Sequence, residues 1–313
     1  MKASLLIALL LISSVTHGQV ASEDIVLNTP SGDLSGTLTF PEGKQKTDLV
    51  VIVPGSGPTD RNGNNPLGVA TNSYKMIAEA LATQEIACLR YDKRGVGKSQ
   101  SAGLSEEDLR FETYIDDLIA WADMLRSDQR FMKIILAGHS EGSLISMVAA
   151  RSPSVDAFIS LEGPGKPIQE VINDQLSSQP PMVQNEARRI MDELLAGNRV
   201  DSIAPFMFSL FRPSVQPYMI SWMKYDPAEV LAQLEKPVLL IQGTTDLQVN
   251  VESARLLKQA QPQANLIVIE GMNHILKKAP ADRIQNMATY TNPDLPLHEK
   301  LITTMVTFVH SIN

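Results

Sequence analysis

The chain has 313 residues, which exceeds a typical single domain and fits one large α/β unit that carries an insertion. Its 35 acidic side chains outnumber the 27 basic ones, and the resulting formal net charge of −8 disfavours binding to nucleic acid. The single cysteine, Cys88, lies within an apolar run and rules out an internal disulfide, so we interpret it as a buried, unreactive thiol.

Residues 1–18 have the layout of a secretory signal peptide. Lys2 precedes an apolar run over residues 3–15, and Gly18 provides a small residue at the predicted cleavage point before Gln19. This run is short for a membrane span, and no later stretch reaches the roughly 20 apolar residues that a membrane helix needs. We therefore expect an exported protein, periplasmic or extracellular, without a membrane span.

The next segments predict a mostly parallel sheet preceded by a hairpin. Residues 24–29 and 33–40 alternate apolar and polar side chains around Pro30-Ser31-Gly32, as in an antiparallel hairpin. Short apolar runs typical of strands buried on both faces follow at 49–53, 86–91, 132–137, 157–161, 238–242 and 266–270. Helical patterns lie between or after them at 73–84, 114–127, 140–151, 251–261 and 298–310. This alternation predicts an α/β fold with helices on both faces of the sheet.

The alternation breaks off at residues 163–234, where strand signals vanish and short helical segments separated by prolines appear. We predict a signal peptide at 1–18, a core at 19–162 and 235–313, and a helical cap at 163–234 inserted in that core. Ligands bind at the carboxyl edge of open α/β sheets, so we expect the cap to cover that edge. Its apolar residues leave two interpretations open, an acyl pocket or plain packing; they are Met207, Phe208, Phe211, Met219, Trp222 and Met223.

A Gly-x-Ser-x-Gly pentapeptide at residues 138–142 predicts a nucleophile. It lies between an apolar run and a helical segment, the context of a tight strand-to-helix turn that exposes a serine hydroxyl. Side chains at positions 138 and 142 would collide in such a turn, which accounts for Gly138 and Gly142. Ser140 is therefore the candidate nucleophile.

A serine hydroxyl needs a base within hydrogen-bond reach. His274 directly follows the strand predicted at 266–270 and is the candidate base. We expect His139 to point away from the site. The remaining histidines are set aside by their positions in the signal peptide and the last helix; they are His17, His298 and His310.

The base needs an acid that holds it in the right tautomer. Asp246 follows the strand predicted at 238–242 and is the candidate acid, which gives the chain order Ser, Asp, His. Glu162 ends the strand at 157–161 and is open to two interpretations, a rival acid or a hinge of the cap.

Negative charge that develops on a substrate carbonyl oxygen needs backbone N–H donors. The amide of Glu141 directly follows the nucleophile at a predicted helix N-terminus. The second donor should come from the loop at residues 54–58, whose glycines let the backbone approach a ligand closely. We choose the amide of Ser56, with that of Gly57 next, and assign the Glu141 side chain no role beyond the first helical turn.

Other polar clusters favour structural roles. Residues 95–99 end like a phosphate loop, but that motif requires glycine where Asp92 stands. We expect Asp92 to pair with Arg94 across a turn, and Asp116-Asp117 to lie on a solvated helix face. Residues 59–64 are open to two interpretations, substrate contact or a turn that Asn and Asp favour. Metal-ligand spacing of His or Cys is lacking in the sequence, and we predict neither a metal nor a cofactor.

These motifs resemble those of the α/β-hydrolase superfamily over nearly all of the chain after residue 18. The resemblance rests on Pro-Gly-Ser-Gly-Pro at 54–58, Asp-Lys-Arg-Gly-Val-Gly-Lys-Ser at 92–99, Gly-His-Ser-Glu-Gly at 138–142, Gly-Thr-Thr-Asp at 243–246 and Gly-Met-Asn-His at 271–274. Within the superfamily the chain is similar to bacterial secreted carboxylesterases, and it departs from lipases whose oxyanion loop begins with His-Gly. The resemblance implies an α/β-hydrolase sheet with a leading antiparallel hairpin and an acyl-transfer reaction.

The resulting hypothesis is a secreted serine hydrolase that cleaves small-molecule acyl esters through an acyl-enzyme. Ser140, His274 and Asp246 form its triad, and the amides of Ser56 and Glu141 hold the oxyanion. Two alternatives stay open, a serine peptidase of aminopeptidase type on the same fold and a non-catalytic binding protein that kept the scaffold. The acyl group, the alcohol and the oligomeric state stay open as well.

Overall fold

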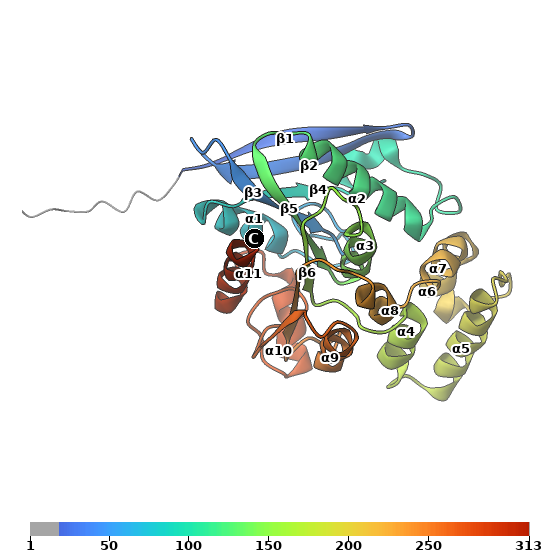
Figure 1. Ribbon diagram of the computed structural model, residues 1–313. Helices are drawn as coiled ribbons and strands as arrows, with labels where there is room; N and C mark the ends of the chain where they lie inside the picture. The colour runs from blue at the N-terminus through green and yellow to red at the C-terminus, as the bar shows by residue number, and fades with distance from the viewer. Residues whose placement is uncertain (1–18, 313) are drawn as a thin grey trace, which may run out of the picture.

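The computed structural model describes residues 19–312, so the predicted signal peptide at residues 1–18 lies outside the described part of the chain. Its centre is one eight-stranded sheet in the order β1-β2-β4-β3-β5-β6-β7-β8, with helices on both faces (Figure 1). The strands are β1 (Val20–Thr29), β2 (Gly32–Pro41), β3 (Thr47–Val53), β4 (Ala87–Tyr91), β5 (Phe131–His139), β6 (Ala157–Leu161), β7 (Val238–Gly243) and β8 (Asn265–Ile269).

Strands β3 to β8 pair in parallel, and β1 and β2 form the antiparallel hairpin. Leu27 faces Leu34 across the hairpin, and β2 then pairs antiparallel with β4. The hairpin therefore extends the parallel sheet at one edge. This arrangement confirms the predicted α/β class with a mostly parallel sheet, and both hairpin strands are longer than the alternating pattern indicated.

Residues of the central strand β3 alternate between two buried apolar clusters, one on each face of the sheet. Val51 packs in the cluster of Trp121, and Val50 and Ile52 pack in the cluster of Ile77. Continuous apolar runs form these strands because helices cover both faces. One face carries α2 (Phe111–Arg126), α3 (Glu141–Ala149) and α9 (Val251–Ala260), and the other carries α1 (Ser73–Thr83) and α11 (Glu299–Ser311) (Figure 1).

Between β6 and β7 the chain forms a helical insertion, residues 163–234, at one end of the molecule (Figure 1). It consists of α4 (Ile168–Leu176), α5 (Pro181–Leu195), η2 (Pro205–Met207), α6 (Phe208–Phe211), η3 (Pro213–Val215), α7 (Gln216–Trp222) and α8 (Pro227–Ala232). Pro181 and Pro227 occupy the first position of their helices, where the missing N–H costs no hydrogen bond. Trp222 stacks on Phe111 of α2 with ring centroids 5.5 Å apart, which joins the insertion to the core.

Three short helices complete the described chain. The 3₁₀ helix η1 (Gly97–Ala102) follows β4, and α10 (Arg283–Ala288) and η4 (Thr289–Thr291) lie between β8 and α11. Asp282 caps α10 by accepting a hydrogen bond from the Gln285 amide.

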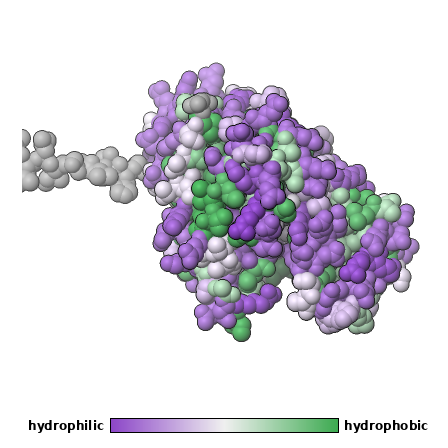
Figure 2. Space-filling model, turned by 60° about the horizontal axis from the view of Figure 1, so that its bottom comes forward, coloured by the Kyte–Doolittle hydropathy of each residue, from purple (hydrophilic) through white to green (hydrophobic). Residues whose placement is uncertain are grey.

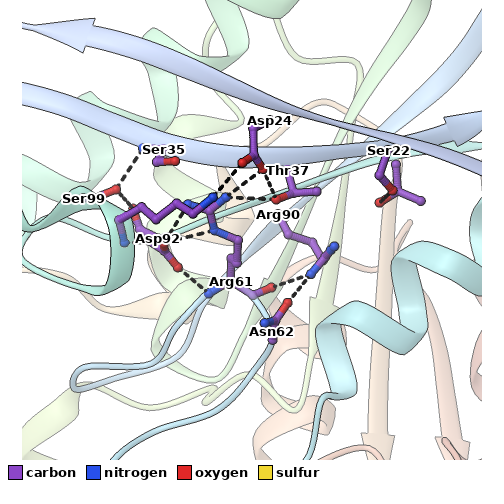
Figure 3. A network of polar contacts seen from close by, with 11 residues as sticks. Ser22, Asp24, Ser35, Thr37, Arg61, Asn62, Arg90, Asp92 and Ser99 are labelled. Carbon is purple, nitrogen blue, oxygen red and sulfur yellow. Dashed lines mark hydrogen bonds and ion pairs between the residues drawn. The ribbon is translucent and has the colours of Figure 1, made fainter.

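A buried ion pair lies against the N-terminal hairpin (Figure 3). Asp92, directly after β4, accepts hydrogen bonds on Oδ2 from the Nε and Nη2 atoms of Arg61 at 3.0 and 2.7 Å, and on Oδ1 from the Arg61 amide at 2.8 Å. The Lys98 amide also donates to Oδ2, at 2.9 Å. Arg61 reaches the hairpin as well, because its Nη1 donates to Thr37 at 2.9 Å.

The expected pairing of Asp92 with Arg94 is therefore wrong. Both Asp92 oxygens are occupied by Arg61 and the Lys98 amide, and Arg94 instead donates to Asp117 Oδ1 of α2 at 2.6 Å. Asp117 is buried by this contact, so the expectation of a solvated face holds for Asp116 and not for Asp117. Asp92 pairs with a residue 31 positions away in the sequence, and Arg94 pairs with one 23 positions away, instead of with each other.

Within residues 19–312 the longest helix has 16 residues, and none combines the length and hydrophobicity of a membrane span. The face drawn in Figure 2 is mostly hydrophilic, with separate hydrophobic patches. Cys88 is fully buried in β4, and burial raises the pKa of its thiol to about 12, which agrees with the predicted unreactive thiol.

Candidate active site

Ser140 occupies a strained turn between β5 and α3. Its φ of 55° and ψ of −122° are backbone angles that residues with a side chain rarely adopt. A Cβ atom on Gly138 would lie 2.1 Å from the Gly142 carbonyl oxygen, and one on Gly142 would lie 2.4 Å from the Val53 carbonyl oxygen. The structure thus gives the physical reason for the glycine at each place and shows the strand-to-helix context that the pentapeptide predicted.

Asp246 and His274 meet at the carboxyl ends of β7 and β8. His274 Nδ1 lies 2.7 Å from Asp246 Oδ2, and both side chains are buried. The amides of Gln248 and Val249 donate to Asp246 Oδ1 at 2.7 and 3.0 Å, which fixes the carboxylate opposite the imidazole. Burial opposes the charged form of Asp246, but the His274 imidazole together with hydrogen bonds from Glu162 and the Val249 amide holds the Asp246 pKa below its ordinary value.

A cavity of about 160 Å³ brings the candidate nucleophile, base and oxyanion loop together. Ser140 and His274 line it with Ser56, and Asp246 stands behind His274. A Cβ atom on Gly55 would lie only 3.3 Å from Ser140 Cβ, so the oxyanion loop passes directly beside the nucleophile. Within residues 19–312 the structure shows the hydrogen bond between His274 and Asp246 and none between Ser140 Oγ and His274.

His139 points into this cavity, so the expectation that it points away is wrong. Its Nδ1 lies 2.7 Å from the Tyr74 hydroxyl, and its Nε2 lies 2.7 Å from the His274 carbonyl oxygen. The Gly55 amide donates to the same Tyr74 hydroxyl at 3.2 Å, so that hydroxyl keeps its own proton for His139 Nδ1. His139 therefore carries its proton on Nε2 and donates it to the His274 carbonyl oxygen. Through Tyr74 and His139, the oxyanion loop is connected to the loop that carries His274.

Burial and the nearby His274 imidazole lower the pKa of His139 to about 3, so the side chain is neutral at physiological pH. This neutrality matters because the two rings are only 4.8 Å apart. A second positive charge would oppose protonation of His274. The sequence around Tyr74 and His139 did not indicate that these two residues belong to the site. Their hydrogen-bond partners lie in segments that are distant in the sequence.

The low pKa of His139 predicts a loss of stability in acid. The unfolded chain binds a proton on this histidine near pH 6.5 and the folded chain only near pH 3, so unfolding becomes more favourable as the pH falls from about 6.5 toward about 3. Above pH 6.5 the residue adds no pH dependence. In urea unfolding between about pH 8 and about pH 4, His139→Gln should lack this part of the wild-type slope. The exposed His310→Gln is the control, and equal slopes for wild type and His139→Gln would contradict the prediction.

Glu162, the rival acid, lies behind Asp246 and not against His274. Its side chain is fully buried, and its two oxygens accept the Gly243 amide at 2.9 and 3.0 Å. The Gln242 side-chain amide donates both to Glu162 and, at 3.3 Å, to Asp246. Burial and the adjacent Asp246 carboxylate raise the pKa of Glu162 well above its ordinary value, which favours the neutral form of this carboxyl group.

The Glu141 side chain is more than the first-turn acid that the sequence suggested. It is buried, its Oε2 lies 3.3 Å from Lys93 Nζ, and its Oε1 accepts a hydrogen bond from Tyr218 at 2.6 Å. Lys93 also donates to the Gly55 carbonyl oxygen at 2.6 Å. Sequence reasoning missed Lys93, and its one signal was a cation placed two residues after the buried strand β4.

None of the described residues that line the 160 Å³ cavity belongs to the helical insertion. Five of the six apolar residues considered for an acyl pocket are buried in the main apolar cluster, and Phe208 is exposed. Packing is therefore the correct interpretation for the five. The insertion does line a second cavity of about 450 Å³ beside the oxyanion loop, to which it contributes Arg212, Val215 and Tyr218.

For the polar residues 59–64 the sequence left two interpretations open, substrate contact or a turn, and the structure supports each for different residues. Thr59 and Gly63 line the 160 Å³ cavity. Asp60 instead closes a turn by accepting the amides of Asn62 and Asn64 at 2.8 and 2.9 Å, and Arg61 is held in its ion pair with Asp92.

Comparison with curated proteins finds esterase-like relatives. EstD, an esterase of Thermotoga maritima, is 29% identical over 265 residues, which are 81% of this chain and 60% of EstD. The chain therefore spans less than two thirds of that relative. A monoglyceride lipase homolog of Monkeypox virus is 22% identical over 67% of this chain and 79% of its own length.

Solved structures show the same fold at low identity. Est1E from Butyrivibrio proteoclasticus, bound to ferulic acid, has a TM-score of 0.61 and 19% identity over 92% of this chain and 100% of its own. The esterase Pf2001 of Pyrococcus furiosus has a TM-score of 0.57 and 16% identity over 93% of this chain and 91% of its own. A family model described as serine aminopeptidase, S33, matches residues 67–228, which is just over half of the chain. By this match and by its fold, the chain belongs to the serine aminopeptidase S33 family of α/β-hydrolases.

Proposed function

We propose that the protein is a serine hydrolase that cleaves carboxylic esters through an acyl-enzyme. The observation that carries the proposal is the 2.7 Å hydrogen bond between His274 and Asp246, at a cavity that Ser140 and Ser56 also line. The similarity to EstD and to solved esterases supports an ester as the substrate class.

In this mechanism Ser140 Oγ attacks the ester carbonyl carbon while His274 Nε2 takes its proton. Asp246 holds Nδ1 of the imidazole and stabilises its charged form. The amides of Ser56 and Glu141 stabilise the tetrahedral oxyanion, and the Glu141 amide lies at the N-terminus of α3. His274 then gives the proton to the leaving alcohol, and water repeats the sequence to release the acid.

The family description favours a second candidate, an aminopeptidase on the same site. An aminopeptidase that binds a free α-ammonium group needs an anionic partner for that charge. None of the described residues that line the 160 Å³ cavity is an aspartate or a glutamate. This lining without carboxylates supports an ester over an aminoacyl amide.

Labelling and substrate choice together test the proposal. A fluorophosphonate should label the wild type and Ser56→Ala, which keeps its backbone amide, but not Ser140→Ala. Labelling of Ser140→Ala would remove Ser140 from the role of nucleophile. The wild type should hydrolyse p-nitrophenyl acyl esters of graded chain length far faster than aminoacyl or prolyl p-nitroanilides. Comparable anilide rates would favour the aminopeptidase, and inactivity of the folded protein on esters, thioesters and amides would favour a binding protein.

We further propose that the protein is exported and that the helical insertion is a cap on the core formed by residues 19–162 and 235–313. The layout of residues 1–18 supports export. Contacts of Tyr218 and Trp222 with the core support the cap. N-terminal sequencing of protein recovered from the periplasm or medium should begin at Gln19, and full-length protein retained in the cytoplasm would contradict export.

A further inference from the structure

Lys93 is a buried cation beside the oxyanion loop, outside the triad and the two oxyanion donors. Its side chain is 2% exposed, and its Nζ donates to the Gly55 carbonyl oxygen at 2.6 Å and to Glu141 Oε2 at 3.3 Å. The ammonium group also lies over the ring of Tyr114, with Nζ 4.9 Å from the ring centroid. Burial of an ammonium group costs free energy that only close partners offset. The groups that Lys93 contacts are therefore the groups on which it can act.

The peptide bond that Lys93 contacts is the one that carries the Ser56 amide. In a trans peptide the C=O and N–H groups point in opposite directions. Lys93 binds the Gly55 carbonyl of this peptide, and the Tyr74 hydroxyl accepts the Gly55 amide of the preceding peptide, so two successive peptide units of the loop are held in place. The Ser56 N–H therefore points away from Lys93, and it has no hydrogen-bond partner within residues 19–312. Ser56 lines the cavity of Ser140, where a free donor is available to an oxyanion.

We propose that Lys93 is a positioning residue of the oxyanion hole: its ammonium group holds the Gly55 carbonyl so that the Ser56 N–H faces the nucleophile. This inference rests on the proposed function, because it concerns the donor to the substrate oxyanion. A hydrogen bond to the carbonyl also polarises the peptide and makes its N–H a stronger donor.

Glu141 and Tyr218 hold Lys93 in turn. Glu141 directly follows the nucleophile, and a lone carboxylate there would oppose negative charge on the substrate oxygen. Lys93 neutralises this carboxylate, and Tyr218 of α7 donates to its other oxygen at 2.6 Å. The helical insertion is thereby connected to the oxyanion loop through Tyr218, Glu141 and Lys93. Lys93 has two separable effects, namely holding a carbonyl and neutralising a carboxylate.

Lys93→Met tests the positioning role, because methionine keeps most of the volume and removes the ammonium group. We expect kcat on a p-nitrophenyl ester to fall about 10- to 100-fold with KM nearly unchanged, since loss of a whole oxyanion donor costs about 10²- to 10³-fold. The inhibition constant of an alkyl boronic acid, which forms a tetrahedral anion on serine, should rise by the same factor. Unchanged kcat and boronate affinity would overturn the proposal.

Arg94→Met is the matched control. Arg94 is the next residue, is similarly buried, forms an ion pair with Asp117, and directs its other hydrogen bonds to Thr29, Ser31 and Ala102 instead of the oxyanion loop. It should lose stability and keep kcat and boronate affinity. An equal fall of kcat in both variants would reduce Lys93 to a general structural role and overturn the proposal.

The double variant Lys93→Met with Glu141→Gln separates the two effects of Lys93. Its kcat should stay low, because the Gly55 carbonyl still lacks its partner, whereas full recovery would mean that Lys93 acts only by neutralising Glu141. If Lys93→Met does not fold, Lys93→Gln, a shorter neutral donor, should show a smaller loss in the same direction, and no loss there would also overturn the proposal. If the wild type has no hydrolytic activity, the proposed function is contradicted. If the wild type is active and Lys93→Met matches it in kcat and boronate affinity, only the Lys93 proposal is contradicted.

Discussion

Asp246→Asn is expected to lower kcat for ester hydrolysis by about 10⁴-fold, the loss seen when a triad aspartate is replaced by its amide. The asparagine side chain can present its NH₂ group to His274 Nδ1, where Asp246 Oδ2 now accepts at 2.7 Å. The imidazole then carries its proton on Nε2, and it cannot take the proton of Ser140. Initial rates on p-nitrophenyl esters measure the loss, and far-ultraviolet circular dichroism checks the fold.

Glu162→Gln is the control that distinguishes the two acids considered from the sequence. Burial and the adjacent Asp246 carboxylate favour the neutral form of Glu162, and glutamine reproduces the shape and charge of that form. We expect kcat to fall less than about tenfold, the cost of one altered hydrogen bond. A large loss in Glu162→Gln together with a small loss in Asp246→Asn would exchange the roles of the two carboxyl groups.

Asp92→Asn is expected to lower the free energy of unfolding by about 3–5 kcal/mol, because it removes the buried counter-charge of Arg61 and leaves only Asp24, which is 54% exposed and 3.5 Å from Arg61. The side chains of both partners are less than 10% exposed, so water cannot replace the lost pair. A loss of this size is a large part of the roughly 5–15 kcal/mol that stabilises a typical domain. Urea unfolding followed by circular dichroism at neutral pH measures it.

Glu79→Gln provides the comparison for an exposed ion pair. Glu79 lies 3.8 Å from Lys75 on α1, and about half of each side chain is exposed. Its loss should change the free energy of unfolding by less than about 1 kcal/mol. Similar losses in Asp92→Asn and Glu79→Gln would show that burial of the Arg61 pair adds nothing to its strength.

Local patterns in the sequence were sufficient to predict the sheet. The strands of the parallel part appear as continuous apolar runs because both faces are covered, as Val50 and Val51 show by packing on opposite sides. The strained turn at Ser140 was also predictable, since two glycines two residues away on either side are a short-range requirement of that turn. The start of β1 was less predictable, because this strand lies at the edge of the sheet and its exposed residues resemble a loop.

Contacts between distant segments could not be predicted from local patterns. Lys93 and Glu141 are 48 residues apart, and Tyr74 and His139 are 65 apart, so no spacing rule connects them. Asp92 and Arg94 show the opposite error, since proximity in sequence suggested a pair that the fold does not form. The partner of a buried charge depends on which segments the folded chain brings together, and composition and periodicity do not show this.

The strands that flank the helical insertion are neighbours in the sheet, and this has a consequence for how the protein can change during evolution. Phe158 pairs with Val238 and Leu161 with Ile241, so the chain leaves and rejoins the sheet at adjacent points. Since the entropy of closing a loop grows only slowly with its length, segments of different size can be exchanged here without disturbing strand pairing. Tyr218 restricts that freedom: a replacement segment without a hydroxyl group at its position leaves one oxygen of Glu141 without its donor.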